Sequence, residues 1–186
     1  MQKAALIAPV TALAVVSTGP RSSATVYAAR GNELLTFTRS TLNASHTLTV
    51  FDHHNVHGIN ACQDARGGEL VLVHGDKAVA LCCTHAATSE TEVRCRLRRL
   101  DDMVLATCWA TVGGCEQLFV GYAHNFLDVF AVKAEVVSGR AAPRLLRRVT
   151  AQDNCCLFSM SIVPEATRVV VVGGTAFGPI YLWASH

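Results

Sequence analysis

Short apolar runs separated by turn residues extend along nearly the whole chain, and helical periodicity is nearly absent. Runs bounded by Gly, Asn, Asp and His in this way are typical of many short β-strands. Four of the runs end at a tight turn that leads into a second apolar run. The pattern therefore predicts an all-β fold with four hairpins, whose first strands are expected at Ala24–Ala28, Glu69–Val73, Leu118–Tyr122 and Val169–Val172.

The turn and the strand after it form a seven-residue unit that recurs along the chain. The four units span residues 31–37, 75–81, 124–130 and 177–183. An earlier apolar strand is expected at Val10–Val15, Gly58–Cys62, Val104–Ala110 and Phe158–Val163, and a later, more polar strand at Thr47–Phe51, Val93–Leu100 and Leu145–Thr150. The resulting repeat of about 45–50 residues compares with roughly 40–45 residues for WD repeats.

Four strands per repeat predict the blades of a β-propeller. Strands covered on both faces by neighbouring blades should be continuously apolar, as Arg168–Val172 is, and an exposed outer strand needs charge to prevent edge-to-edge pairing. A β-sandwich is the alternative fold, but it does not predict the repeated unit. The blades are expected at about 1–53, 54–101, 102–151 and 152–186.

The fourth blade is expected to be incomplete. The sequence stops at His186, soon after Trp183, and leaves no room for an outer strand. Propellers commonly have about 4–8 blades, and closure usually requires a complete last blade. We therefore expect an incomplete propeller that is the N-terminal part of a longer protein, and an exposed blade face in the truncated form. The sequence leaves open whether residues 1–186 fold without the missing blades.

Several residues carry a resemblance to WD-repeat proteins. Gly75–Val79 resembles the Asp-containing turn of a WD repeat, Trp183 matches the strand-end Trp, and His57 with Gly58 resembles the Gly-His pair in reversed order. Only one of the four units ends in Trp, and only one has Asp in its turn. More narrowly, the chain resembles the first part of the large WD-repeat subunit that partners the tRNA ribose 2′-O-methyltransferase of the anticodon wobble nucleotide. The segments that carry this resemblance are Pro9–Leu13, Val56–Gly58, Val120–Asn125, Val171–Gly174 and Leu182–Trp183.

This resemblance implies a non-catalytic, cytoplasmic scaffold subunit. In the family, the propellers bind the methyltransferase and help to present tRNA, and the partner holds S-adenosylmethionine. The chain itself is then expected to bind no cofactor, to have an RNA methyltransferase as its protein partner, and to have tRNA as a candidate second partner. A WD-repeat interaction scaffold in another assembly is the first alternative. An enzyme built on a propeller is the second, and the apolar character of the presumed channel strands argues against it.

Composition and cysteine usage bear on the compartment. Hydrophobic residues make up 51% of the chain and charged residues 16%, which argues against disorder. No apolar run reaches the roughly 18 residues that a membrane-spanning helix needs. Met1–Thr18 resembles a signal peptide, but Pro9 interrupts its apolar run and Lys3 is its only basic residue. Four of the eight cysteines form adjacent pairs that bridge each other badly, so reduced thiols are expected rather than the disulfides of a secreted protein.

Candidate catalytic and metal-binding residues are few. His53 and His57 have a spacing found in zinc sites, but no second ligand pair of matching spacing follows. We expect instead a polar loop in which His57 forms local hydrogen bonds. Phosphate-binding loops, nucleophile elbows and zinc-protease motifs do not occur in the sequence. No catalytic residue and no metal site is therefore predicted, and the paired acids Asp101 and Asp102 are expected to be solvated.

Clustered arginines are the feature best suited to direct contact with a partner. Half of the 16 basic residues lie in segments 94–99 and 140–148. Arg94, Arg96 and Arg98 should share one face of a strand, and two such outer strands could form a cationic ridge. Guanidinium groups suit phosphate, although charge at an exposed edge also prevents aggregation without any ligand. The predicted ridge for contact with RNA or a protein partner consists of Arg94, Arg96, Arg98, Arg99, Arg144, Arg147 and Arg148.

Overall fold

The all-β prediction is confirmed by a computed structural model of the chain, which describes residues 9–17, 24–38, 44–63, 68–85, 88, 90–151, 155–176 and 178–185. Every strand expected from the sequence is present. The strands are β1 (Val10–Ser17), β2 (Ala24–Arg30), β3 (Glu33–Thr38), β4 (His46–Thr49), β5 (Gly58–Gln63), β6 (Glu69–His74), β7 (Val79–Thr84), β8 (Thr91–Leu97), β9 (Val104–Val112), β10 (Cys115–Tyr122), β11 (Phe126–Ala131), β12 (Arg144–Thr150), β13 (Ser159–Pro164), β14 (Val169–Gly174) and β15 (Ile180–Ser185).

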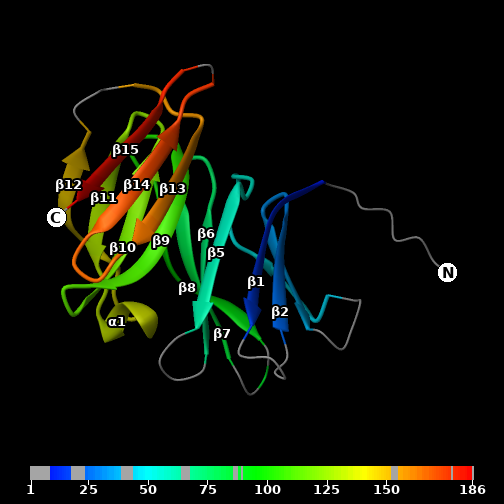
Figure 1. Cartoon of the computed structure of the whole chain (residues 1–186). Coiled ribbons are helices and arrows are strands. Elements are labelled where there is room, and N and C mark those ends of the chain that lie inside the picture. Colours follow the sequence, from blue (N-terminus) through cyan, green and yellow to red (C-terminus); the bar gives the residue numbers. More distant parts are fainter. Residues whose placement is uncertain are drawn as a thin grey trace.

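The strands form four antiparallel sheets that follow one another along the chain. Three sheets have four strands each, β1–β4, β5–β8 and β9–β12, and the fourth has β13–β15 among the described residues. Neighbouring sheets contact one another through their first strands, β1 with β5, β5 with β9 and β9 with β13. In Figure 1 the sheets fan out from the blue β1–β2 pair on one side to the red β15 on the other. This is the arrangement of blades in a β-propeller, and we number the sheets as blades 1 to 4.

Alternating side chains on a central strand serve two blade interfaces at once. On β6, Val71 and Val73 pack against blade 1, whereas Leu70 and Leu72 pack against blade 3. Successive side chains of a strand point to opposite faces of its sheet. A strand between two blades must therefore be apolar at every position, which explains why the sequence shows continuous runs here instead of alternation.

A buried polar network joins blades 1 and 2. The Tyr27 hydroxyl of β2 forms hydrogen bonds with Glu69 of β6 and with Thr84 of β7, at 2.7 Å to the latter. Thr84 lies 2.9 Å from Thr91, which lies 3.1 Å from Thr36. Burial and the bond to Glu69 raise the pKa of Tyr27 well above its usual value. The network satisfies polar groups that would be costly if left unpaired in this interface.

Blades 1 and 4 each have one apolar face that no described residue covers. On β1, Leu13 and Val15 are 66% and 63% exposed, and on β15 Ile180 and Leu182 are 75% and 71% exposed. Their neighbours on the same strands point the other way into the inter-blade cores, as Trp183 does. The exposed side chains thus lie on faces of blades 1 and 4 that correspond to the faces through which blades 2 and 3 pack against their neighbours.

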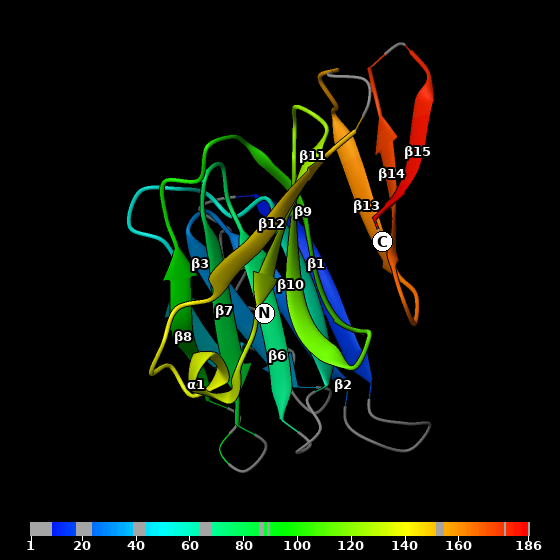
Figure 2. The ribbon, with the colours of Figure 1, turned by 90° about the vertical axis from the view of Figure 1, so that its left-hand side faces the viewer.

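Two local features were not expected from the sequence. A short helix, α1 (Ala134–Val137), lies in the connection between β11 and β12 and contacts β8 (Figure 2). A β-bulge interrupts the pairing of β7 with β8, where Leu81 opposes Cys95 and Cys82 opposes Val93. Residues 1–8 and 18 of the signal-peptide-like segment, Phe177 at the start of the fourth turn unit, and His186 lie outside the described residues.

Candidate functional site

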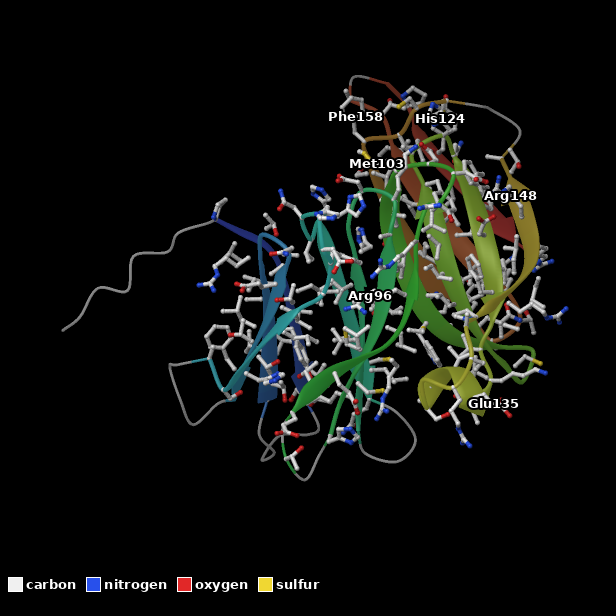
Figure 3. All side chains as sticks on the ribbon, turned by 180° about the vertical axis from the view of Figure 1, so that it is seen from behind. Arg96, Met103, His124, Glu135, Arg148 and Phe158 are labelled. Carbon is white, nitrogen blue, oxygen red and sulfur yellow. The ribbon has the colours of Figure 1, made fainter. Side chains whose placement is uncertain are left out.

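One end of the molecule is built from the connections between blades and the turns within them. The same backbone hydrogen bond recurs there three times: Val56 N–H to Gly31 at 2.7 Å, Val104 N–H to Asp76 at 2.8 Å, and Leu157 N–H to Ala123 at 2.7 Å. Each bond fixes the connection leaving a blade onto the turn between that blade's second and third strands. We call this end the loop face, and Figure 3 shows Met103, His124 and Phe158 on it and Glu135 at the opposite end.

Histidine–aspartate pairs add a second link between connections and turns. In blade 2, His57 of the connection lies 2.8 Å from Asp76 of the turn, and His54 lies 3.4 Å from the same carboxylate. In blade 3 the residue types are exchanged, because Asp102 is in the connection and His124 is in the turn, 2.9 Å apart. The expectation that His57 forms local hydrogen bonds is confirmed.

The acids of the connection between blades 2 and 3 are not simply solvated, which corrects the prediction for that pair. Partial burial acts to raise the pKa of Asp102, but hydrogen bonds from the backbone and ring of His124 hold it below its usual value. Asp101 forms an ion pair with Arg148 at 2.8 Å. Both carboxylates thus fix the connection in place, a role that only the fold reveals.

A hollow of about 370 Å³ opens on the loop face between two connections. Its walls come from the connection between blades 1 and 2, from the turn just before β7, and from the connection between blades 2 and 3. Arg98 and Asp52 form an ion pair at 3.0 Å. The lining residues are Phe51, Asp52, His53, His54, Ala78, Arg98 and Arg99.

The arginines of the first predicted cluster do not share one face. Arg96 donates to the Val50 carbonyl of blade 1 at 2.7 Å, whereas Arg94 lies beside Gly139, next to α1, and pairs with Glu92 at 2.6 Å. The bulge in β8 breaks the alternation of side chains on which the prediction depended. Arg98 lies beyond the end of the strand. The structure therefore separates the side chains that the sequence predicted to be aligned.

Arg148 of the second cluster is engaged within its own blade. Its guanidinium bonds to the buried Asp128 carboxylate at 2.7 and 2.9 Å and lies 4.5 Å from the Phe126 ring centroid. Its pKa is raised by these hydrogen bonds. Arg144 and Arg147 lie on the exposed strand β12, at the outer edge of blade 3 (Figure 2).

Sequence reasoning missed the buried side chains that support these surfaces. Asp128 is 2% exposed in the middle of β11, and Tyr122 donates a hydrogen bond to it at 2.9 Å. An acid inside the apolar segment 126–130 was the available signal, because a buried carboxylate needs hydrogen-bonding partners. Glu69 at the start of β6 gave no comparable signal.

The cysteines and the inner strands offer little reactive chemistry. The structure joins none of the eight cysteines in a disulfide, and burial raises the pKa of Cys108 on β9 to about 11 and that of Cys82 on β7 to about 12. A thiol with such a pKa is a poor nucleophile near neutral pH. Among the described residues no group of three or more His, Cys, Asp or Glu is placed to hold a metal ion. That the chain has no catalytic residue and no metal site stays a prediction.

Comparison with known proteins identifies the fold of the chain. No protein-family model and no curated protein sequence matches it. Solved WD-repeat β-propellers do match, including Saccharomyces cerevisiae Sqt1 with a TM-score of 0.65, 11% identity and 95% of this chain covered. The β-propeller domain of Myceliophteria thermophila Cps50 (Swd1) has a TM-score of 0.62 and 11% identity, and covers 95% of this chain.

A third similar structure is BBS1N, solved in complex with ARL6DN, with a TM-score of 0.64, 10% identity and 95% of this chain covered. The chain spans 44% of the Sqt1 chain, 54% of the Cps50 chain and 52% of the BBS1N chain, about half of each. These likenesses establish the β-propeller fold. Among the described residues, no helix has the length and apolar character needed to cross a membrane.

Proposed function

We propose that the chain is a non-catalytic WD-repeat scaffold that binds a protein partner through its loop face. The observation that carries this proposal is the repeated anchoring of connections onto turns, which gives the loop face a fixed shape before any partner arrives. Preorganised surfaces lose less conformational freedom on binding. The loop face also presents apolar side chains beside charged ones, since Met103 is 44% and Phe158 71% exposed.

The proposed partner is the tRNA ribose 2′-O-methyltransferase of the wobble nucleotide, in the cytoplasm. The support is the resemblance carried by Pro9–Leu13, Val56–Gly58 and the segments after them. Propellers of similar fold occur in assemblies with other proteins, as in BBS1N with ARL6DN and in the mitotic checkpoint complex. On this proposal the methyltransferase supplies the cofactor and the reaction, and the present chain supplies a binding surface.

Further blades are proposed to cover the two open apolar faces in the complete protein. Leu13 on β1 and Leu182 on β15 are exposed on blade faces of the kind that is buried where described blades meet. Contiguous apolar surface of this kind is typical of interaction sites. The coverage of about half of each similar structure supports the same proposal.

We propose that only part of the predicted arginine ridge contacts a partner. Five of its seven members interact with other groups within the fold: Arg94, Arg96, Arg98, Arg147 and Arg148. We propose that Arg144, on the exposed strand β12, contacts tRNA phosphate or an acidic surface of the methyltransferase. Phosphate contacts of this kind would make binding sensitive to salt.

Affinity purification of the endogenous protein with an N-terminal tag, followed by mass spectrometry and RNA analysis, tests the proposal. We expect an S-adenosylmethionine-dependent RNA methyltransferase and tRNA to co-purify, and less tRNA to co-purify with an Arg144→Glu variant. Absence of a methyltransferase would overturn the tRNA-modification role. A different stable protein assembly in its place would favour the alternative, a WD-repeat scaffold serving another complex.

A further inference from the structure

The hollow on the loop face has walls that are fixed by backbone contacts. On one side, the Phe51 carbonyl accepts a hydrogen bond from the Asn32 side chain at 2.8 Å. On the other, the Leu100 N–H donates to the Lys77 carbonyl at 3.1 Å. Gly75 packs beneath the first wall so closely that a Cβ atom there would lie 3.3 Å from both His54 and the Phe51 ring. The hollow is therefore a preformed feature rather than a gap between mobile loops.

Arg99 gives this hollow an excess of positive charge. The described residues that line it include two guanidinium groups and a single carboxylate, that of Asp52, which already pairs with Arg98. No acidic side chain among the described residues forms an ion pair with Arg99, which is exposed. Arg99 also has a φ of 57°, a left-handed conformation that is uncommon for a residue other than glycine. The backbone thus holds an uncompensated cation at the mouth of a preformed hollow.

We infer that the hollow binds a single acidic side chain of the protein partner. A glutamate could lay its aliphatic stem against Phe51 and Ala78 and place its carboxylate at Arg99, with the His53 and His54 rings as further hydrogen-bonding groups. A guanidinium donates to a carboxylate with favourable geometry. This inference rests on the proposed scaffold function and specifies the chemistry that the partner must present.

The surrounding charges favour a peptide over a nucleic acid. Asp76, Asp101 and Asp102 lie on the turn and the connection that flank the hollow. These carboxylates would repel a continuous phosphate backbone, which carries a charge at every nucleotide. A single carboxylate seated at Arg99 avoids that repulsion. The site is therefore suited to one acidic side chain and not to a polyanion.

Fluorescence anisotropy with the full chain tests this inference. The probe is a short fluorescein-labelled peptide with a single glutamate among alanines, and the competitor is a single-stranded RNA oligonucleotide with the same number of residues. Asn tolerates the left-handed conformation, so Arg99→Asn removes the guanidinium without straining the backbone. We expect this variant to bind the peptide about tenfold more weakly, as for the loss of one charge-assisted hydrogen-bonding group. Arg140→Asn, which removes the same charge at the opposite end of the molecule, should leave binding unchanged.

The inference is overturned if wild type shows no saturable peptide binding, or if Arg99→Asn binds as tightly as wild type while its thermal unfolding is unchanged. RNA that binds more tightly than the peptide, with the same dependence on Arg99, would make the hollow an RNA contact instead. If peptide binding fails while the methyltransferase still co-purifies with the tagged protein, only the hollow is rejected. If peptide binding holds and no methyltransferase co-purifies, only the tRNA-modification role is rejected.

Discussion

At the scale of single residues, the buried His74 shows how tightly the blades are packed. Its ring lies against Gly58 so closely that a Cβ atom at Gly58 would sit 2.0 Å from the His74 Nε2 atom. Its Nδ1 atom is buried without a hydrogen-bond partner. Burial, together with the nearby His57, lowers the pKa of His74 to about 4. The imidazole is therefore neutral in the folded protein at neutral pH.

This residue should make the protein less stable in acid. Between the unfolded pKa of 6.5 and the folded value of about 4, the unfolded chain binds more protons, so stability falls as pH falls through that window. From pH 7 to pH 5, we expect His74→Leu to lose roughly 2 kcal/mol less unfolding free energy than wild type loses. Urea unfolding at both pH values measures the difference. The exposed His53, changed to Leu, is the control, and equal losses in wild type and His74→Leu would contradict the prediction.

At the scale of elements, a buried charge links β11 to β12 in addition to their backbone pairing. Asp128 of β11 lies opposite Arg148 of β12, and Tyr122 of β10 also donates to the Asp128 carboxylate. Burial raises the pKa of Tyr122 above its usual value, and the adjacent Asp128 carboxylate, with its hydrogen bond from Tyr122, raises it further. Arg148 covers the carboxylate from the solvent side. The ion pair between Arg148 and Asp128 thus adds to the backbone ladder that joins the outer strand β12 to β11.

Removal of that guanidinium should therefore destabilise blade 3. We expect Arg148→Met to lower the unfolding free energy by about 2 kcal/mol, because Asp128 is then left buried with one partner fewer. Arg144→Met, on the same strand and exposed, should change it by less than about 0.5 kcal/mol. Combining Arg148→Met with Asp128→Asn should recover part of the loss, as denaturant titrations would show. Additive effects of the two substitutions would mean that the pair is not coupled.

At the scale of the whole molecule, the blades differ in how many of their faces are covered. Blades 2 and 3 are packed on both sides, whereas blades 1 and 4 each expose one apolar face. In repeat proteins, stability is approximately the sum of the repeats and of the interfaces between neighbours. The end blades should consequently be the least stable parts of the isolated chain and the parts most prone to association (Figure 1).

Charged substitutions on the open faces distinguish the isolated chain from a completed propeller. In the isolated chain, Leu13→Glu with Leu182→Glu should reduce the binding of a hydrophobic dye and change the unfolding free energy by less than about 1 kcal/mol. Val171→Glu, on the covered face of β14, is the matched control and should unfold blade 4. In a protein whose further blades cover these faces, the same double substitution should be strongly destabilising. Unchanged dye binding in the isolated chain would mean that these faces are already covered.

The strands and their turns could be predicted from sequence alone because their causes are local. Apolar runs, turn residues and the recurrence of a seven-residue unit depend on neighbours in the chain, and they predicted every strand from β1 to β15. The polar loop that contains His53 and His57 could likewise be predicted from the local sequence. The short helix α1 and the bulge in β8 were not predicted, because each depends on contacts with other elements.

The surface chemistry was decided only by the tertiary structure. Whether an arginine can bind a partner depends on the groups around it in the fold. Arg148 pairs with Asp128 of the neighbouring strand, Arg96 donates to a carbonyl of another blade, and Arg99 lines a hollow. Blade 2 has its histidine in the connection and its aspartate in the turn, and blade 3 has the reverse. This relation is visible only when the fold brings connection and turn together. Periodicity determines which residues form strands and turns. Charge compensation depends on distances between segments far apart in the chain, and only the packing of the blades sets those distances.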